Sequence, residues 1–229
     1  FVYDDNGHLK YRCRADGRLI EYGNDKKGRP LKTTIYAECI AMSTVKTIDV
    51  ATLDQAKKIN AKQDRTTYRI LNAMGYCRYL IDAKGYVIQK DYNDAGDVLK
   101  RKAFDKKIDL TQLKTLTPDA VSALVAPLQA DSGNHITYHI YDDLGRLAYC
   151  LRVRADQTCC VDGYVQNALG ELTTRIRYAA SLAMPTSFDF KTIDDAAKKI
   201  ANVAKDRKIA IEYDALGRPT KETYCPDID

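Results

Sequence analysis

Short runs rich in Tyr, Val, Ile and Thr alternate along this chain with clusters of Asp, Asn and Gly. Residues 86–92 and 97–101 are two such runs, separated by a polar cluster that ends in Gly96. A cluster of this kind between two β-prone runs is typical of a β-hairpin, and the glycine supplies the positive φ that a tight turn needs. The pattern predicts an antiparallel meander with strands of about five or six residues.

Three longer stretches change to a helical spacing of apolar residues. Leu53, Ala56 and Ile59 fall on one face of a helix. Thr117 followed by Pro118 is typical of a helix N-terminus, and residues 192–204 are a near copy of the first stretch. We therefore expect amphipathic helices near residues 50–62, 117–130 and 192–205, each burying its apolar stripe on one face of the sheet.

The chain also repeats itself on a longer scale. Tyr3–Leu9 returns as Tyr141–Leu147 and again as Tyr213–Pro219. The glycines at the corresponding place, at positions 7, 75, 145 and 217, follow one another at nearly equal intervals. Such self-similarity indicates a repeat architecture. The sequence predicts tandem units at 1–67, 68–135 and 136–208, each with one helix, and the start of a fourth unit at 209–229.

A shorter period lies inside each large unit. Gly75, Gly85 and Gly96 reproduce the spacing of the first three turn glycines of the chain. In the third unit, however, the interval from Gly145 to Gly170 is longer than the matching interval from Gly75 to Gly96. Counting back from Gly170, we expect the four extra residues to lie before Asp156, within residues 150–155.

The residues that recur with these periods are expected to be structural. Each belongs to a turn or to the strand end next to it, where Asp and Asn bond the backbone and Gly permits the turn. They are Tyr3, Asp4, Gly7, Gly17, Gly28, Gly75, Gly85, Gly96, Tyr141, Asp142, Gly145, Arg146, Gly170, Tyr213, Asp214, Gly217 and Arg218.

The motif Tyr-Asp-x-x-Gly-Arg-Leu resembles the signature of YD repeats, also called RHS repeats. Tyr141–Leu147 match it at every fixed position, Tyr213–Arg218 match it up to Pro219, and Tyr3–Leu9 differ at His8. The resemblance covers nearly the whole chain apart from the three helical stretches.

The resemblance implies a mainly β fold with α insertions, an antiparallel β-hairpin repeat that forms a solenoid or shell segment. In Rhs polymorphic toxins and the B/C components of Tc insecticidal toxins, such repeats enclose a C-terminal toxin, and in teneurins they display an adhesion surface. The resemblance therefore implies a secreted or cell-surface parent protein, without catalytic residues or cofactors in the repeat itself. The expected partners are neighbouring YD repeats and an enclosed effector domain.

The amino-acid composition limits the class of protein to which this chain can belong. Hydrophobic residues make up 45% and charged residues 29% of the 229 positions, which excludes wholesale disorder. The net charge of +5 is spread along the chain, which argues against nucleic acid as a partner. The apolar stretch 123–128 is too short to cross a bilayer. The chain begins with Phe1, so we expect a processed product or a piece of a longer protein.

Four groups of residues resemble chemical sites, and we interpret each as structural. Paired carboxylates such as Asp142 and Asp143 recur at turns. His135 and His139 are four apart, but apolar residues alternate with polar ones around them, as in a strand. Residues 91–97 resemble the start of a calcium loop but lack an acidic residue at 95. Cys159 and Cys160 are adjacent, so in a strand they point to opposite faces.

The sequence is compatible with two functions. One is a shell or scaffold that encloses or presents another domain. The other is a self-assembling extracellular fibre or adhesion module, with carbohydrate as a candidate ligand because the 16 tyrosines offer stacking surfaces. The alternative role for the motif tyrosines is a structural ladder between neighbouring strands, which we favour because they recur with the turns. An enzyme is not expected.

Overall fold

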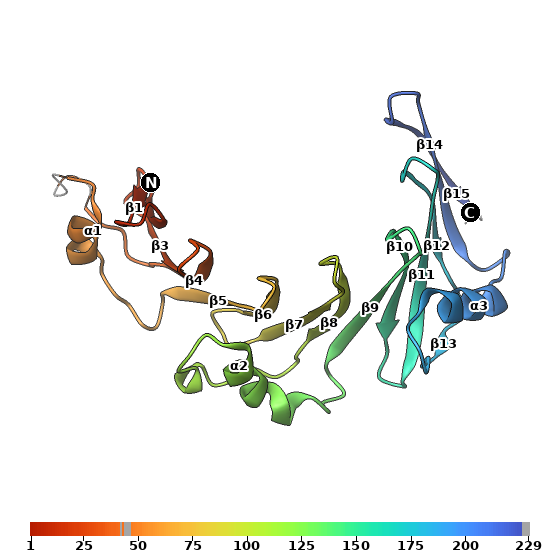
Figure 1. The fold of residues 1–229 in the computed structure, drawn as a ribbon, viewed down its shortest axis with the longest axis horizontal. Coiled ribbons are helices and arrows are strands. Elements are labelled where there is room, and N and C mark those ends of the chain that lie inside the picture. The colour runs from red at the N-terminus through yellow and green to blue at the C-terminus, as the bar shows by residue number, and fades with distance from the viewer. Residues whose placement is uncertain (42, 44–46, 226–229) are drawn as a thin grey trace. The chain divides into compact units, whose positions relative to one another are not determined.

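The computed structural model describes residues 1–41, 43 and 47–225. Within them are 15 strands and three α-helices, and every strand pairing defined among them is antiparallel (Figure 1). The expectation of a mainly β fold with α insertions is confirmed. None of the described helices has the length and hydropathy of a bilayer-spanning segment.

The chain divides into two compact units. The first comprises Phe1–Gln89 and Phe104–Asp131, and the second Lys90–Ala103 and Ser132–Asp229. The chain passes between the two units three times, after Gln89, after Ala103 and after Asp131. The long sequence repeat is a different division of the same chain and stays a prediction.

In the first unit, strands follow one another across the sheet in sequence order. They are β1 (Val2–Tyr3), β2 (Leu9–Cys13), β3 (Leu19–Asn24), β4 (Pro30–Ile35), β5 (Arg65–Leu71), β6 (Cys77–Ile81) and β7 (Val87–Tyr92). The unit also holds α1 (Val50–Ala56), α2 (Pro118–Val125) and two short 3₁₀ turns, η2 (Leu110–Gln112) and η3 (Ala126–Leu128).

In the second unit, the order across the sheet is β8, β9, β10, β11, β12, β14 and β15, and the short β13 pairs with β11. The strands are β8 (Val98–Ala103), β9 (His135–Tyr141), β10 (Leu147–Val153), β11 (Thr158–Gln166), β12 (Leu172–Arg177), β13 (Leu182–Ala183), β14 (Arg207–Tyr213) and β15 (Pro219–Cys225). Helix α3 (Phe190–Ile200) connects β13 to β14.

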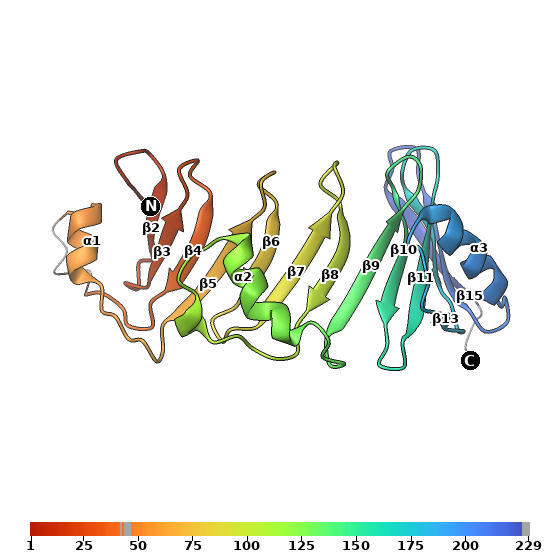
Figure 2. The same cartoon turned by 60° about the horizontal axis from the view of Figure 1, so that its bottom comes forward.

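The three helices dock on the sheet in the same way. Each begins at a residue whose side chain accepts a hydrogen bond from the third backbone N–H that follows: Asp49, Thr117 and Asp189. The fourth residue after each cap, Leu53, Val121 or Ile193, is fully buried in its own hydrophobic cluster. Figure 2 shows α2 lying across strands of the first unit. Each helix therefore covers one face of its hairpins, as its apolar stripe requires.

The helices are shorter than the sequence pattern predicts. Helix α1 ends at Ala56, and Ile59, which shares the helical spacing, is 74% exposed. Helix α3 ends at Ile200, and Val203 is 95% exposed. Residues 126–128 continue α2 only as a 3₁₀ turn. The helical spacing of apolar residues thus continues past the end of each α-helix. Only the segment that packs on the sheet is α-helical.

The third unit of the sequence contains a turn that no glycine marks. Gln157 has φ +61° and closes the β10–β11 hairpin by donating its N–H to the Arg154 carbonyl at 3.1 Å. The expectation that all four extra residues precede Asp156 is therefore wrong. Gln157 divides them equally, two in the stretch that carries β10 and two in the stretch that carries β11. Paired strands must lengthen together, and by an even number, to keep their register and faces.

Candidate functional site: the hairpin turns and an arginine-lined face

The hairpin turns share one backbone geometry, which Asp142 to Arg146 illustrate. Gly145 donates its N–H to the Asp142 carbonyl at 2.9 Å, and Asp142 donates its N–H to the Arg146 carbonyl at 2.8 Å. Gly145 has φ +75°. This is a three-residue loop that ends in a left-handed residue, and it leaves a bulge in the strand register.

The same geometry recurs at the glycines singled out in the sequence. All of them have φ between +73° and +92°: Gly7, Gly17, Gly28, Gly75, Gly85, Gly96, Gly145, Gly170 and Gly217. Two of these turns also touch a neighbouring loop. A Cβ on Gly17 would lie 2.1 Å from the Ile40 carbonyl oxygen, and one on Gly85 would lie 2.5 Å from that of Ile108. These two positions thus need glycine for space as well as for φ.

The Asp and Arg of the motif form a clamp across the turn. Asp142 Oδ1 accepts the backbone N–H groups of Leu144 and Arg146, and its Oδ2 accepts Nε of Arg146 at 2.8 Å and lies 2.7 Å from Nη2. Burial alone would raise the pKa of Asp142, but the bonds from Arg146 outweigh it and hold this pKa below its usual value. Asp25–Arg29 and Asp214–Arg218 form the same clamp.

In two further turns the donor and acceptor side chains are exchanged, with a neutral Asn first and a carboxylate four residues later. Asn167 Oδ1 accepts the Glu171 backbone N–H, and its Nδ2 donates to Glu171 Oε2 at 2.6 Å. Asn93 and Asp97 repeat this arrangement. These turns therefore share two features. The first turn residue has a side-chain oxygen that accepts backbone N–H groups, and the residue four positions later has a side chain that pairs with the remaining polar atom of that same side chain. Asp4 also caps its turn, with His8 in the place of Arg.

At four of these five clamps, the residue before the clamp links its hairpin to an earlier one. The hydroxyls of Tyr141 and Tyr213 donate to the backbone carbonyls of Val98 and Leu172, at 3.2 and 3.0 Å. Each acceptor lies two residues after a turn glycine. Asn24 and Gln166 make the equivalent bonds to Leu9 and Leu147. Side chains at this position thus act as ties between hairpins, which fits the ladder interpretation for Tyr141 and Tyr213; Tyr3 is 57% exposed.

A second set of tyrosines, which the sequence pattern did not single out, fastens two helices to the sheet. Tyr11 in β2 donates its hydroxyl hydrogen to Asp54 in α1 at 2.6 Å, and Lys57 Nζ lies 2.6 Å from the same carboxylate. Tyr149 and Asp194 repeat this pair in the second unit. Burial and the Asp partner raise the pKa of both tyrosines. The signal was present, since both tyrosines follow a turn glycine by four residues and both helices carry Asp five residues after the cap.

The histidines lie where the alternating pattern puts them, on strand β9. His139 is directly opposite Cys150 of β10, and its buried Nδ1 has no hydrogen-bond partner among the described residues. Burial, and secondly the charge of Arg101, lower the pKa of His139. The part of the chain that the structure describes contains no group of three or more His, Cys, Asp or Glu placed to hold a metal ion.

The remaining candidates are accounted for by local structure. Asn93 and Asp97, at the calcium-like stretch, bond each other across a turn. Cys159 is buried with its Sγ 3.8 Å from the Met184 sulfur, whereas Cys160 Sγ accepts a hydrogen bond from Arg154 Nε at 2.9 Å. Both are free thiols. Each of these groups thus contacts other residues of the fold, and its interpretation as structural stays a prediction.

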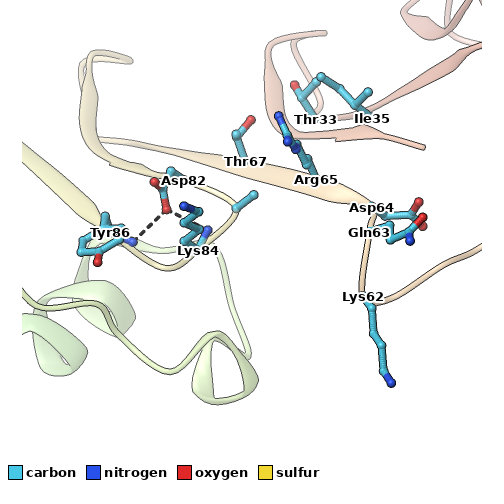
Figure 3. A pocket seen from close by; sticks show the side chains of 11 residues that line it. Thr33, Ile35, Lys62, Gln63, Asp64, Arg65, Thr67, Asp82, Lys84 and Tyr86 are labelled. Atoms are coloured by element: carbon cyan, nitrogen blue, oxygen red, sulfur yellow. Dashed lines mark hydrogen bonds between the residues drawn. The ribbon is translucent and has the colours of Figure 1, made fainter. Parts of the chain in front are cut away.

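A groove of about 840 Å³ lies in the first unit (Figure 3). Thr33 and Thr67, opposite each other on β4 and β5, form part of its floor, and the β6–β7 turn forms one side. Its carboxylates serve the backbone: Asp82 accepts the N–H groups of Lys84 and Tyr86, and Asp64 accepts those of Ala37 and Asn60. Both carboxylates that line the groove are therefore already hydrogen-bonded to backbone N–H groups.

A fully buried carboxylate lies in the second unit, on the face opposite α3. Asp162 of β11 accepts a hydrogen bond from Arg177 Nε at 2.9 Å, and Arg152 Nη2 lies 2.8 Å from its other oxygen as an ion pair out of line for a hydrogen bond. Two further arginines, Arg175 and Arg207, join Arg177 in lining a pocket of about 230 Å³. Arginine thus outnumbers acid on this face.

No family model and no curated protein matches the chain. Solved structures to which it is similar include that of TcdB2-TccC3, at 12% identity and a TM-score of 0.34 over 90% of this chain. Another is that of TcdB2-TccC3-Cdc42, at 11% identity and a TM-score of 0.30 over 91% of this chain. The chain spans 11% of the length of each of these.

Proposed function

We propose that this chain is a non-catalytic repeat region of a large secreted or surface protein of the YD-repeat type, a scaffold that encloses or presents another domain. The observation that carries the proposal is the tie between successive hairpins. Four side chains donate to a carbonyl that lies two residues after a turn glycine of an earlier hairpin: those of Asn24, Tyr141, Gln166 and Tyr213. A contact that recurs with the hairpins allows a sheet to be extended hairpin by hairpin, because each unit is stabilised by its neighbour.

The use of the polar motif residues supports the same conclusion. In three of the turns, one oxygen of the Asp carboxylate accepts backbone N–H groups of the turn and the other pairs with an arginine of the same turn. These carboxylates are those of Asp25, Asp142 and Asp214. Catalytic carboxylates must instead reach a substrate. The repetition of these motif residues along the chain also favours a structural role, because one active site does not need several copies of its residues.

The test uses the native polypeptide that carries this sequence. A specific protease site is introduced between the repeat region and the domain next to it, the connection is cut, and the products are separated by size-exclusion chromatography. An enclosed or presented domain stays with the repeat region after the cut, and an enclosed one also resists a broad-specificity protease that digests it when expressed alone.

The matched variants are D142A/D214A, which removes two clamps, and K199Q, on the exposed side of α3. The first is expected to weaken retention and the second to leave it unchanged. A domain that separates freely after the cut contradicts the proposal. Concentration-dependent growth of the particles with no retained domain would instead support a fibre.

A further inference from the structure

The second unit concentrates positive charge on one small area of the sheet face opposite α3. Arg177 of β12 is directly opposite Arg207 of β14 in the strand register, and Arg175, two residues before Arg177, lies on the same face. Like charges directly opposite each other across a strand pair destabilise a sheet. The arrangement therefore has an electrostatic cost that the described fold does not offset at Arg207.

The charges nearby do not neutralise the cluster. Asp162 is the partner of both Arg152 and Arg177. Arg175 and Arg207 do not contact this carboxylate, so the four arginines and one aspartate leave three positive charges. Among the described residues, Arg207 has no carboxylate partner, and its side chain is exposed. An anion in the pocket between Arg175, Arg177 and Arg207 would relieve this repulsion.

Two of the guanidinium groups are held in place before any ligand arrives. Arg177 is fixed by its hydrogen bond to the fully buried Asp162. Arg175 lies over the ring of Tyr164, its guanidinium carbon 6.0 Å from the ring centroid. Preorganised arginines lose less side-chain entropy on binding. Ile209 completes the pocket with an apolar wall.

We propose that the face formed by Arg175, Arg177 and Arg207 binds the carboxylates of an acidic polypeptide segment. The size of the pocket, about 230 Å³, suits a carboxylate side chain. The Arg177–Asp162 bond shows the same chemistry within the fold: a guanidinium of this face paired with an aspartate. The biological setting rests on the proposed scaffold function, in which the acidic segment belongs to the enclosed or presented domain. The binding itself is measurable on this chain alone.

The first experiment measures fluorescence anisotropy of a labelled peptide of alternating Glu and Ser, with the Gln/Ser peptide as its neutral match. The acidic peptide is expected to bind, more weakly at high salt, and the neutral peptide not to bind. R175Q and R207Q are each expected to weaken binding by about fivefold, the upper end for a partly exposed ion pair. K199Q removes the same charge from the opposite side of the sheet and is expected to bind as the unmodified chain does.

A second measurement separates loss of binding from loss of fold. Without peptide, R207Q is expected to keep or slightly raise the melting temperature, because one repelling charge is gone. Saturating acidic peptide raises the melting temperature of the unmodified chain and raises that of R207Q less.

Three results would overturn the inference. One is absence of binding by the acidic peptide. Another is equal weakening by K199Q and R207Q, which means that only net charge matters. The third is binding of inorganic polyphosphate or single-stranded DNA without binding of the peptide, which identifies a different class of partner. If the peptide binds here while the cut domain of the native protein separates freely, the site stands and the scaffold function fails.

Discussion

Tyr149 in β10 donates its hydroxyl hydrogen to Asp194 in α3 at 2.7 Å, and Lys198 lies 2.5 Å from the other oxygen of that carboxylate. The pair joins the hairpins of the second unit to the helix inserted between them. Tyr11 and Asp54 make the same bond in the first unit. The helices are short and are held to the sheet by the burial of Leu53 and Ile193. The Tyr–Asp hydrogen bonds in addition fix the orientation of each helix on the sheet.

Replacing Tyr149 by Phe removes this anchor while keeping the ring. We expect Y149F to lower the free energy of unfolding by about 1.5 kcal/mol, the lower end for a hydrogen bond to a charged group, since Asp194 keeps its contact with Lys198. Urea unfolding followed by circular dichroism measures the loss. Y86F, at a tyrosine that is 43% exposed, is the control, and equal losses in the two variants would refute the anchor.

The turn clamp predicts a compensating pair of substitutions. D142N retains an acceptor for the backbone N–H groups but loses the ion pair with Arg146, and we expect a loss of about 1 kcal/mol. Adding R146E recreates the amide–carboxylate clamp that Asn167 and Glu171 form. D142N/R146E should therefore be more stable than D142N. A double variant less stable than both single variants would show that the clamp is not a unit.

Backbone conformation at Gln157 predicts a stabilising substitution. A non-glycine residue at φ +61° carries a strain of about 1–2 kcal/mol, whereas glycine adds about 0.4–1 kcal/mol of entropy to the unfolded chain. Q157G should raise the free energy of unfolding by about 0.5–1 kcal/mol, measured by denaturant titration. An unchanged or lower stability would argue against the left-handed turn.

The glycines themselves divide into two classes. G145A meets open space and should cost only the strain of about 1 kcal/mol. G85A places its Cβ 2.5 Å from the Ile108 oxygen and disturbs the bond from Ile108 N–H to the Gly85 carbonyl, so we expect a loss of about 2–3 kcal/mol. The same unfolding experiment ranks the two, and equal losses would contradict the close approach of the loop to Gly85.

His139 predicts how stability changes in mild acid. Its pKa in the folded chain is lowered by burial and by Arg101, so the unfolded chain binds the proton more tightly. Stability is therefore retained above about pH 6.5, the usual value for histidine, and falls as the pH drops below it. H139Q should flatten the change in urea midpoint between pH 7 and pH 5. H135Q, at an exposed histidine of the same strand, should not, and a reversed ranking would contradict the assignment.

The parts of this fold that were predictable are those with a local cause. The turn glycines follow from the conformations that only glycine adopts easily, and the start of α2 follows from Thr117 and Pro118. The turn at Gln157 has no such signal, because glutamine rarely has positive φ, so the extra residues were misplaced. The arginine face also depends on pairing between strands as distant as β12 and β14, which alternation within one strand does not reveal.

The central claim is that this chain is one stretch of a longer repeat scaffold, and the intact mass of the native polypeptide tests it most directly. Mass spectrometry of the protein isolated from the cells that make it should give a value several times 25.8 kDa, the mass of these 229 residues. A mass near 25.8 kDa would contradict the claim, because so few hairpin units leave no wall to surround a second domain.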